Sequence, residues 1–258
     1  MQTSNPSAVY PSLSNRVILV TGGASGIGAA VVEAFARQFA SVAFLDVQDD
    51  AAGSLKETID AEGGKVPAYY RCDLTDTNSL QATIAMVVER FGKIDVLVNN
   101  AGNDTRHSIE SVTPEFWDRC MAINLKQQFF ACQAVIPKMR EARHGSIINM
   151  SSIAWTIPST GLSVYVTAKA AIVGMTRTLA HELGGDNIRV NCIMPGAILT
   201  NRQKELWFTP EYEAEVLGSQ ALKRLITPDE VANLALFLAS DASAAITNQS
   251  FVIDAGWT

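Results

Sequence analysis

The fold is decided by the stretch RVILVTGGASGIG, residues 16–28. After Arg16, its first part is a continuous aliphatic and β-branched run, the pattern of a parallel strand that is covered on both faces. Gly22, Gly26 and Gly28 then fall at the expected turn from strand to helix. Glycines allow positive φ and close backbone approach, and the free N–H groups at the start of a helix can face an anion such as a pyrophosphate. A glycine-rich helix cap without a ligand is the alternative.

The same order, a strand followed by a helix, repeats along the chain. Further strands are expected at residues 41–46, 66–72, 94–99, 146–150 and 188–194, and one long helix is expected to run from residue 114 to residue 140. Strands that alternate with helices of this length indicate βαβ units with right-handed crossovers. We therefore predict an α/β fold with a doubly wound parallel sheet.

Length and composition favour one domain over residues 1–258, preceded by a polar lead-in at residues 1–14. The net charge of −6, without a basic run, argues against nucleic acid and an anionic membrane surface as partners. The four cysteines form no CxxC pair, so neither a zinc site nor a disulfide framework is expected. The start lacks the pattern of a signal peptide, and no apolar run nears the roughly 18 residues of a membrane span. A cytoplasmic location is expected.

An acidic residue ends the second expected strand. Asp46 stands eighteen residues after Gly28, where a carboxylate can accept hydrogen bonds from the ribose hydroxyls of an adenosine. The same carboxylate would repel a 2′-phosphate, and neither Ser25 nor Val47 offers a basic side chain. The pattern favours NAD over NADP. An aspartate that only caps the next helix is the alternative.

Three polar side chains suggest a proton-transfer site. Tyr165 and Lys169 are four residues apart, which on a helix places their Cβ atoms roughly 5–6 Å from each other on one face. A tyrosine is a poor base at neutral pH, and a nearby cation favours its phenolate. Ser152, just beyond the fifth strand, adds a hydroxyl at the edge where ligands bind in open α/β sheets.

Together these motifs resemble the classical short-chain dehydrogenases/reductases. The residues that carry the resemblance are TGGASGIG, NNAG at 99–102, Asn124 in INL, Ser152, Tyr165 with Lys169, and PGAILT at 195–200. The resemblance implies a Rossmann-type domain with seven strands, the last near residues 251–254, an NAD cofactor and no metal. It implies contacts to the cofactor from Gly22, Ser25, Gly26, Ile27, Gly28, Asp46, Val47, Asp73, Leu74, Asn100, Ala101, Gly102, Tyr165, Lys169, Pro195, Gly196, Ile198 and Thr200.

The resemblance also implies roles for the catalytic residues. Tyr165 would be the base, and Lys169 would bind the nicotinamide ribose and lower the pKa of Tyr165. Ser152 would hydrogen-bond the reacting oxygen, Asn124 would position a water that relays the proton, and Thr200 would reach the nicotinamide carboxamide. The alternatives are structural: Asn124 as a satisfied polar residue inside a helix, and Ser152 as a cap.

The residues near the expected pocket are polar and aromatic. The candidates for substrate binding are Asn103, Asp104, Arg106, His107, Ser152, Trp155, Tyr165, Arg202 and Trp207. Fixed donors and acceptors beside a flat aromatic wall fit a small sugar better than a steroid or an acyl chain. Alternatively, Arg106 and His107 form a solvated loop or a subunit contact, and Trp207 packs a lid.

Four segments resemble bacterial short-chain sugar 1-dehydrogenases of the D-xylose type: YPSL, NNAGNDTRH, NRQKELWFTPE and IDAGWT. That resemblance implies transfer of hydride from C1 of an aldose of the D-xylose, L-arabinose or D-galactose type to NAD, which gives the lactone. It further suggests a homotetramer or homodimer that forms through the Tyr165 helix and the C-terminal strand. Residues 197–227 form a connection long enough to be a flap over the substrate. An NAD-dependent secondary-alcohol dehydrogenase or ketone reductase with another substrate, and a non-catalytic NAD-binding sensor, stay open.

Overall fold

The computed structural model describes residues 8–258, so the first seven residues of the expected lead-in lie outside the described part. One parallel sheet of seven strands forms the centre, in the order β3-β2-β1-β4-β5-β6-β7. The strands are β1 (Val17–Thr21), β2 (Ser41–Asp46), β3 (Ala68–Arg71), β4 (Val96–Asn99), β5 (Gly145–Met150), β6 (Ile188–Pro195) and β7 (Ser250–Ile253). The predicted doubly wound sheet, including its seventh strand, is confirmed.

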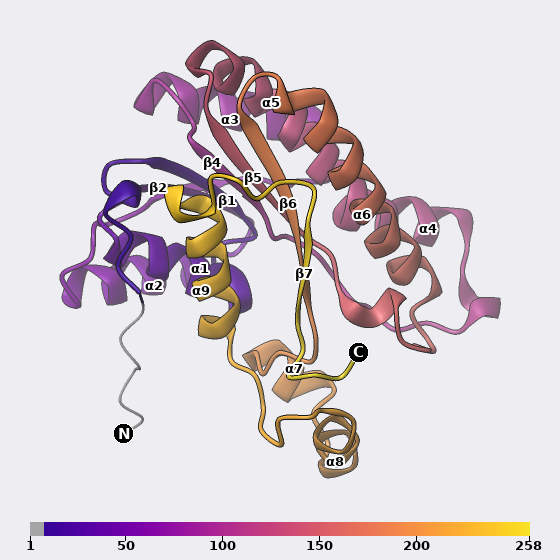
Figure 1. Cartoon of the computed structure of the whole chain (residues 1–258). Coiled ribbons are helices and arrows are strands. Elements are labelled where there is room, and N and C mark those ends of the chain that lie inside the picture. Colours follow the sequence, from indigo (N-terminus) through magenta and orange to yellow (C-terminus); the bar gives the residue numbers. More distant parts are fainter. Residues whose placement is uncertain (1–7) are drawn as a thin grey trace.

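Helices cover both faces of the sheet (Figure 1). They are α1 (Gly26–Arg37), α2 (Asp49–Ala61), α3 (Thr77–Phe91), α4 (Pro114–Met121), α5 (Gln127–Ala142), α6 (Ser163–Gly184), α7 (Asn201–Leu206), α8 (Pro210–Ser219) and α9 (Pro228–Ala239). Helices α1, α2 and α9 share one apolar core with the sheet, and α3, α5 and α6 share the other. No helix in the described part of the chain is both long enough and apolar enough to cross a bilayer.

The central strands β1, β2 and β4 are largely apolar because both of their faces are buried. Every side chain of β1 and β5 is buried, and large residues such as Phe35 of α1 and Phe44 of β2 are completely covered. Full burial of such a side chain contributes about 1.5–3 kcal/mol to stability. The two cores on either side of the sheet therefore fix the positions of the strand ends, on which the site depends.

The long helix expected at residues 114–140 is present and contains one irregular turn. A π-helical turn at Ala122–Lys126 separates α4 from α5, and Asn124 lies completely buried at its centre. Asn124 Nδ2 donates to the Cys120 carbonyl oxygen (3.0 Å) and to the Asn103 carbonyl oxygen (3.0 Å), while its Oδ1 accepts from the Asn103 N–H (2.8 Å). The two bonds to Asn103, in a loop outside the helix, hold the irregular turn in place.

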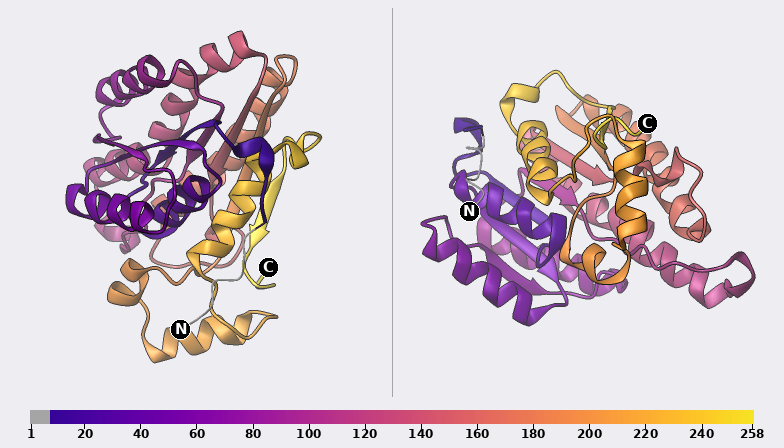
Figure 2. Two further views of the ribbon diagram at one scale, coloured as in Figure 1. Left: turned by 90° about the vertical axis from the view of Figure 1, so that its left-hand side faces the viewer. Right: turned by 90° about the horizontal axis from the view of Figure 1, so that it is seen from below.

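The order of the strands reverses between β1 and β4, and ligands bind in open sheets at the carboxyl edge beside such a reversal. The connection that follows β6 contains α7 and α8. These two short helices project beyond the carboxyl edge of the sheet (Figures 1 and 2). Helices α7 and α8 make up about half of residues 197–227, the segment expected to be a flap, and their N-caps are Thr200 and Thr209.

Candidate active site

The turn between β1 and α1 cannot accommodate side chains at its glycines. Gly22 and Gly26 have φ of +66° and +56°. A Cβ on Gly28 would lie 1.8 Å from the Gly22 carbonyl oxygen, and one on Gly22 would lie 2.8 Å from Ala101 Cα. Ser25 is the N-cap of α1, but its side chain makes no capping hydrogen bond. The first backbone N–H groups of α1, including the N–H of Ile27, are thus placed to bind an anion.

Asp46 ends β2 directly beside this turn and is only 7% exposed. Its Oδ2 accepts from the Ala24 N–H (2.9 Å), and its Oδ1 accepts from the Val47 and Gln48 N–H groups (2.8 and 3.1 Å). Oδ2 keeps the capacity for a second donor such as a ribose hydroxyl, since each carboxylate oxygen has two acceptor sites. The Gln48 amide also bridges Asp46 Oδ1 (3.2 Å) and Ser25 Oγ (3.1 Å), a contact that no pattern in the sequence indicates.

Asp73 follows β3, as predicted, and Leu74 beside it is buried. Hydrogen bonds from the Thr75 hydroxyl (2.7 Å) and N–H (2.9 Å) hold the pKa of Asp73 below its usual value, and the positive charge of Arg119 acts in the same direction. A cavity of about 520 Å³ lies beside this loop, and its lining residues are Thr75, Asp118, Arg119, Met121, Ala122 and Lys126. The sequence offered no signal for this cavity because α4 and the β3 loop are far apart along the chain.

Two further strand ends complete the same edge. After β4, Asn100 Nδ2 donates to the Gly22 carbonyl oxygen (2.9 Å), which ties NNAG to the glycine turn. After β6, which ends at Pro195, the Gly196 N–H donates to Ile253, and Ile198 is buried. Thr200 Cγ2 lies 3.3 Å from where a Cβ of Gly26 would be, so these two segments meet. The structure thus brings together all the strand ends expected to bind the cofactor.

Tyr165 and Lys169 lie on consecutive turns of α6, with Lys169 Nζ 5.5 Å from the centre of the Tyr165 ring. Lys169 is 3% exposed, and its ammonium donates to the Met150 carbonyl oxygen (2.9 Å) at the end of β5. Ser152 follows the same strand, and its hydroxyl accepts from the Ala154 N–H (3.1 Å), so it also serves as the expected cap. The predicted trio is assembled at the carboxyl edge.

The pKa of Tyr165 differs from the expectation. Burial raises the pKa above its ordinary value, and the negative charge of Asp104 raises it further, whereas the Ser152 hydroxyl lowers it. Lys169 is not among the groups that shift this pKa, so its acidifying effect on the phenol stays a prediction. Burial also lowers the pKa of Lys169 to about 8, and the ammonium is directed at a backbone carbonyl. Desolvation is the largest cause of the shift in both groups.

Asn124 lies close to this group. A Cβ on Gly102 would lie 3.1 Å from Asn124 Oδ1 and 3.2 Å from Lys169 Nζ, so both side chains pack over the same glycine. The amide of Asn124 is already satisfied by Asn103 and Cys120, as the structural alternative expected. Asn124 fixes the loop that begins at Asn103; the water relay stays a prediction. Cys120, one helical turn before Asn124, is a neighbour that its spacing could have revealed.

Most of the predicted substrate residues contact one another across two segments. Arg202 Nη2 donates to Asn103 Oδ1 (3.2 Å), and Arg202 Nε lies 3.5 Å from Asp104 Oδ1. The Arg106 guanidinium stacks 4.5 Å from the Trp207 ring and 5.6 Å from the ring of Tyr212, whose part in this contact the sequence did not indicate. Gln203 adds a hydrogen bond to Asp104 Oδ2 (2.7 Å). We call these contacts between residues 103–106 and residues 202–212 the latch.

Besides Ser152 and Tyr165, two predicted substrate residues lie outside the latch. His107 is directed at α4 and α6, where its ring packs 4.8 Å from that of Phe116 and its Nε2 lies 3.1 Å from Ser163 Oγ. Trp155 stands in the short helix after Ser152 and is 37% exposed. Among residues 8–258, no group of three or more His, Cys, Asp or Glu side chains is arranged to hold a metal ion.

Residues 22–258 match the family model described as enoyl-(acyl carrier protein) reductase. The chain belongs to the short-chain dehydrogenase/reductase family of oxidoreductases. It is 47% identical over 251 residues to the D-xylose 1-dehydrogenase of Caulobacter vibrioides, which covers 97% of this chain and 99% of the relative. It is equally identical to a Rhizobium meliloti protein named "Probable galactose dehydrogenase GalD", over 97% and 98% of the two chains. A structure of 7α-hydroxysteroid dehydrogenase with NADH and 7-oxo glycochenodeoxycholic acid superposes with a TM-score of 0.91 at 34% identity, over 96% of each chain.

Proposed function

We propose that the protein is an NAD-dependent sugar 1-dehydrogenase that oxidises C1 of an aldose of the D-xylose, L-arabinose or D-galactose type to the lactone. The observation that carries this proposal is the 47% identity to two relatives named for xylose and galactose, over nearly the full length of each chain. Family membership alone sets the type of reaction, whereas similarity at this level extends through the segments that surround the substrate.

The residues at the carboxyl edge fit a dinucleotide. The glycine turn leaves room for a pyrophosphate at the start of α1, Asp46 Oδ2 is available to a ribose hydroxyl, and Gly102 leaves space beside Lys169. The bound nicotinamide would accept the hydride. Asp46 supports NAD rather than NADP, because its carboxylate would repel a 2′-phosphate. Lys169, Thr200 and the NNAG segment would hold the nicotinamide end.

Proton transfer falls to Tyr165. Its phenolate would take the proton from the anomeric hydroxyl while Ser152 donates a hydrogen bond to the same oxygen. Because burial raises the pKa of Tyr165, the phenolate is scarce at neutral pH, and the oxidation rate should increase toward alkaline pH. Asn124 supports the site by holding the loop at Asn103 in place.

The latch supports a sugar as the substrate. Carboxylate, amide and guanidinium groups converge there from Asn103, Asp104 and Arg202. The indole Nε1 of Trp207 is buried without a partner among residues 8–258, and a sugar hydroxyl would satisfy it. Buried donors left unpaired by an analogue that lacks hydroxyls would give strong discrimination.

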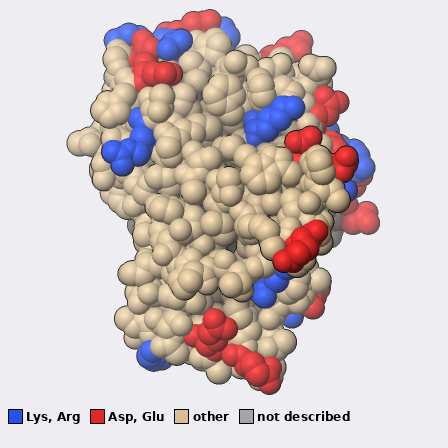
Figure 3. All heavy atoms as spheres, turned by 90° about the vertical axis from the view of Figure 1, so that its right-hand side faces the viewer, with Lys and Arg blue, Asp and Glu red and all other residues tan. Residues whose placement is uncertain are grey.

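We infer that the chain assembles into a homotetramer or homodimer through α6 and β7. The face that carries α6 has few charged atoms over its central part (Figure 3). Val252 of β7 is 46% exposed, although it is a large aliphatic residue at the edge of the sheet. A cytoplasmic location is supported by the four cysteines, which are all free.

The proposal is tested by following NADH formation with a panel of aldoses and aliphatic alcohols, with NAD and NADP in parallel. We expect turnover with one or more of xylose, arabinose and galactose, and a preference for NAD. Turnover confined to alcohols would indicate the secondary-alcohol dehydrogenase, and NAD binding without any turnover would indicate the sensor.

A further inference from the structure

A cation lies beside the adenosine end of the proposed cofactor site. Arg71 is the last residue of β3, and the strand register pairs it with Asp46. Paired residues of neighbouring strands point to the same face about 4.8 Å apart. The contact of the Phe44 and Tyr69 rings, 5.3 Å between centres, shows this shared face two residues earlier in each strand. The side chain of Arg71 therefore leaves the backbone directly beside Asp46, the carboxylate proposed to hold the ribose.

Asp49, the first residue of α2, engages this cation. One oxygen of Asp49 forms an ion pair with Arg71 Nη1, and the same nitrogen donates to the Val47 carbonyl oxygen (3.0 Å). The other oxygen accepts from the Tyr69 hydroxyl (2.7 Å), which is also 3.1 Å from the Asp46 carbonyl oxygen. The Asp49 carboxylate is thus fixed from two sides.

A phosphate on the ribose 2′-hydroxyl would need a cation at this place. A guanidinium binds phosphate through two parallel hydrogen bonds, provided that its charge and donors are free. In this structure the charge of Arg71 is paired with Asp49, and its Nη1 donor is engaged by Asp49 and the Val47 carbonyl oxygen. Neither its charge nor its full set of donors is therefore free for a phosphate. Arg71, a group able to bind phosphate, thus lies beside the Asp49 carboxylate that occupies it.

We propose that Asp49 is a specificity-determining residue, which by engaging Arg71 withholds the guanidinium from the 2′ position and so selects the unphosphorylated dinucleotide. This inference rests on the proposed adenosine site at Asp46. Discrimination against a 2′-phosphate would then have two sources. Asp46 repels the phosphate directly, and Asp49 removes the neighbouring cation that would bind it.

The test measures binding of two probes to the full chain by calorimetry, namely 5′-AMP and adenosine 2′,5′-bisphosphate. Asp49→Asn should tighten binding of the bisphosphate roughly tenfold, the effect of one additional hydrogen bond to a charged group, and leave 5′-AMP unchanged. Asp50→Asn is the matched control, because it removes the same charge from the same helical turn and Asp50 does not contact Arg71. It should change neither affinity.

The double variant Asp49→Asn/Arg71→Gln should lose the gain. An unchanged affinity of Asp49→Asn for the bisphosphate, with normal 5′-AMP binding, would overturn the inference. An equal gain in the double variant would overturn it as well, because the guanidinium of Arg71 would then not be needed for the gain. An equal gain in Asp50→Asn would also overturn it, because a lower negative charge alone would then be sufficient. Failure of the native chain to bind 5′-AMP would instead contradict the adenosine site of the proposed function, and the inference would fall with it.

Discussion

At the scale of single residues, the site is governed by desolvation. Tyr165 and Lys169 are the expected pair, yet burial raises the pKa of the phenol and lowers that of the ammonium to about 8. Both shifts disfavour the charged forms, as burial does for any ionisable group. The spacing of the two residues could be read from the sequence. Their burial depends on packing between α6, β5 and the loop at Asp104, so the direction of the pKa shifts could not be predicted from the sequence.

Tyr165→Phe should remove the base and leave the rest of the site in place. We expect oxidation to fall by about 10²–10⁴-fold, the usual contribution of a general base, while NAD binding changes little. Turnover is measured from NADH formation, and binding from quenching of protein fluorescence. Activity within a few-fold of the native level would mean that another group takes the proton.

Asp104→Asn should shift the pH dependence of oxidation. The charge of Asp104 raises the pKa of Tyr165, so its removal lowers that pKa and lets the phenolate form at lower pH. The alkaline limb of kcat/KM should therefore move to lower pH. Glu205→Gln, an exposed residue of α7, removes one charge nearby and should leave the profile in place. A profile that is the same in Asp104→Asn and the native protein would rule out this electrostatic effect.

At the scale of elements, regular segments follow from the sequence and irregular ones do not. The strand at residues 17–21 was predictable because burial on both faces favours apolar residues at nearly every position, here all but Thr21. The π-helical turn at Ala122–Lys126 was not, because Asn124 is held by Asn103, which no local pattern places nearby. The pairing of Arg71 with Asp46 likewise depends on strand register, which only the assembled sheet sets.

The latch should control the mobility of α7 and α8. Arg106→Leu removes the stacking on Trp207 and Tyr212, a contact of the kind that contributes about 0.5–2 kcal/mol. We expect amide hydrogen exchange across residues 201–219 to become at least twofold faster. Arg177→Leu, at an exposed position on α6, is the control and should not alter exchange there.

Residues 197–227 are also predicted to close over the substrate. NAD together with a sugar substrate should therefore slow hydrogen exchange in this segment, because closure protects its backbone amides. The same exchange rates with and without both ligands would contradict a lid. Slower exchange in the native protein but not in Arg106→Leu would show that the latch carries the closure.

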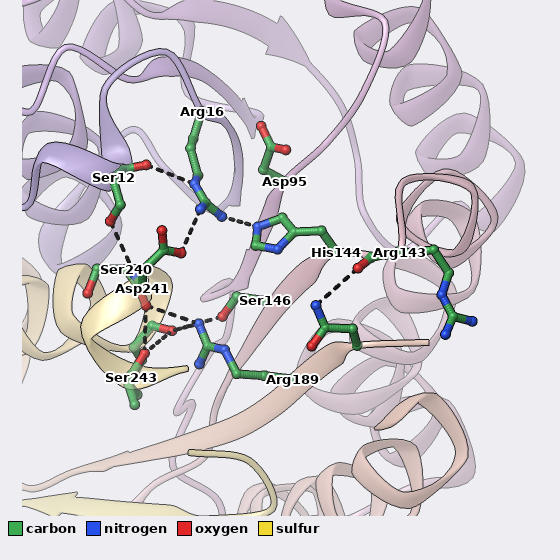
Figure 4. Close-up of polar contacts among 12 residues, drawn as sticks. Ser12, Arg16, Asp95, Arg143, His144, Ser146, Arg189, Ser240, Asp241 and Ser243 are labelled. Atoms are coloured by element: carbon green, nitrogen blue, oxygen red, sulfur yellow. Dashed lines mark hydrogen bonds and ion pairs between the residues drawn. The ribbon is translucent and has the colours of Figure 1, made fainter. Parts of the chain in front are cut away.

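At the scale of the whole molecule, the amino ends of the strands are joined by a polar cluster far from the site (Figure 4). Arg16 donates to the Ser12 carbonyl oxygen (2.8 Å), pairs with Asp241 (2.7 Å) and contacts His144 Nε2. Arg189 donates to the Leu238 carbonyl oxygen (2.7 Å). The cluster thereby connects the start of the described chain, the α5–β5 turn and the end of α9.

We expect this cluster to make the stability of the protein depend on pH. Burial and then the charge of Arg16 lower the pKa of His144, and a contact with a guanidinium donor requires an unprotonated Nε2. The unfolded chain therefore binds a proton near pH 6.5, its usual value, while the folded chain does not. This contribution to the free energy of unfolding is fully present above pH 6.5 and is lost as the pH falls through the lowered pKa.

Urea denaturation between pH 8 and pH 5 measures this effect. The free energy of unfolding of His144→Gln should fall less over that range than that of the native protein, whereas His181→Gln, on the exposed side of α6, should behave like the native protein. Equal losses in the native protein and in His144→Gln would assign the pH dependence to other groups.

Isotopic labelling is the most direct test of whether hydride leaves C1 of an aldose. D-xylose, L-arabinose and D-galactose that carry deuterium only at C1 are incubated with the protein and NAD, and the reduced cofactor is analysed by mass spectrometry. We expect one deuterium in the NADH formed from each sugar that is turned over, with the unlabelled lactone as the other product. Unlabelled NADH, with deuterium retained at C1 of the sugar product, would contradict this expectation.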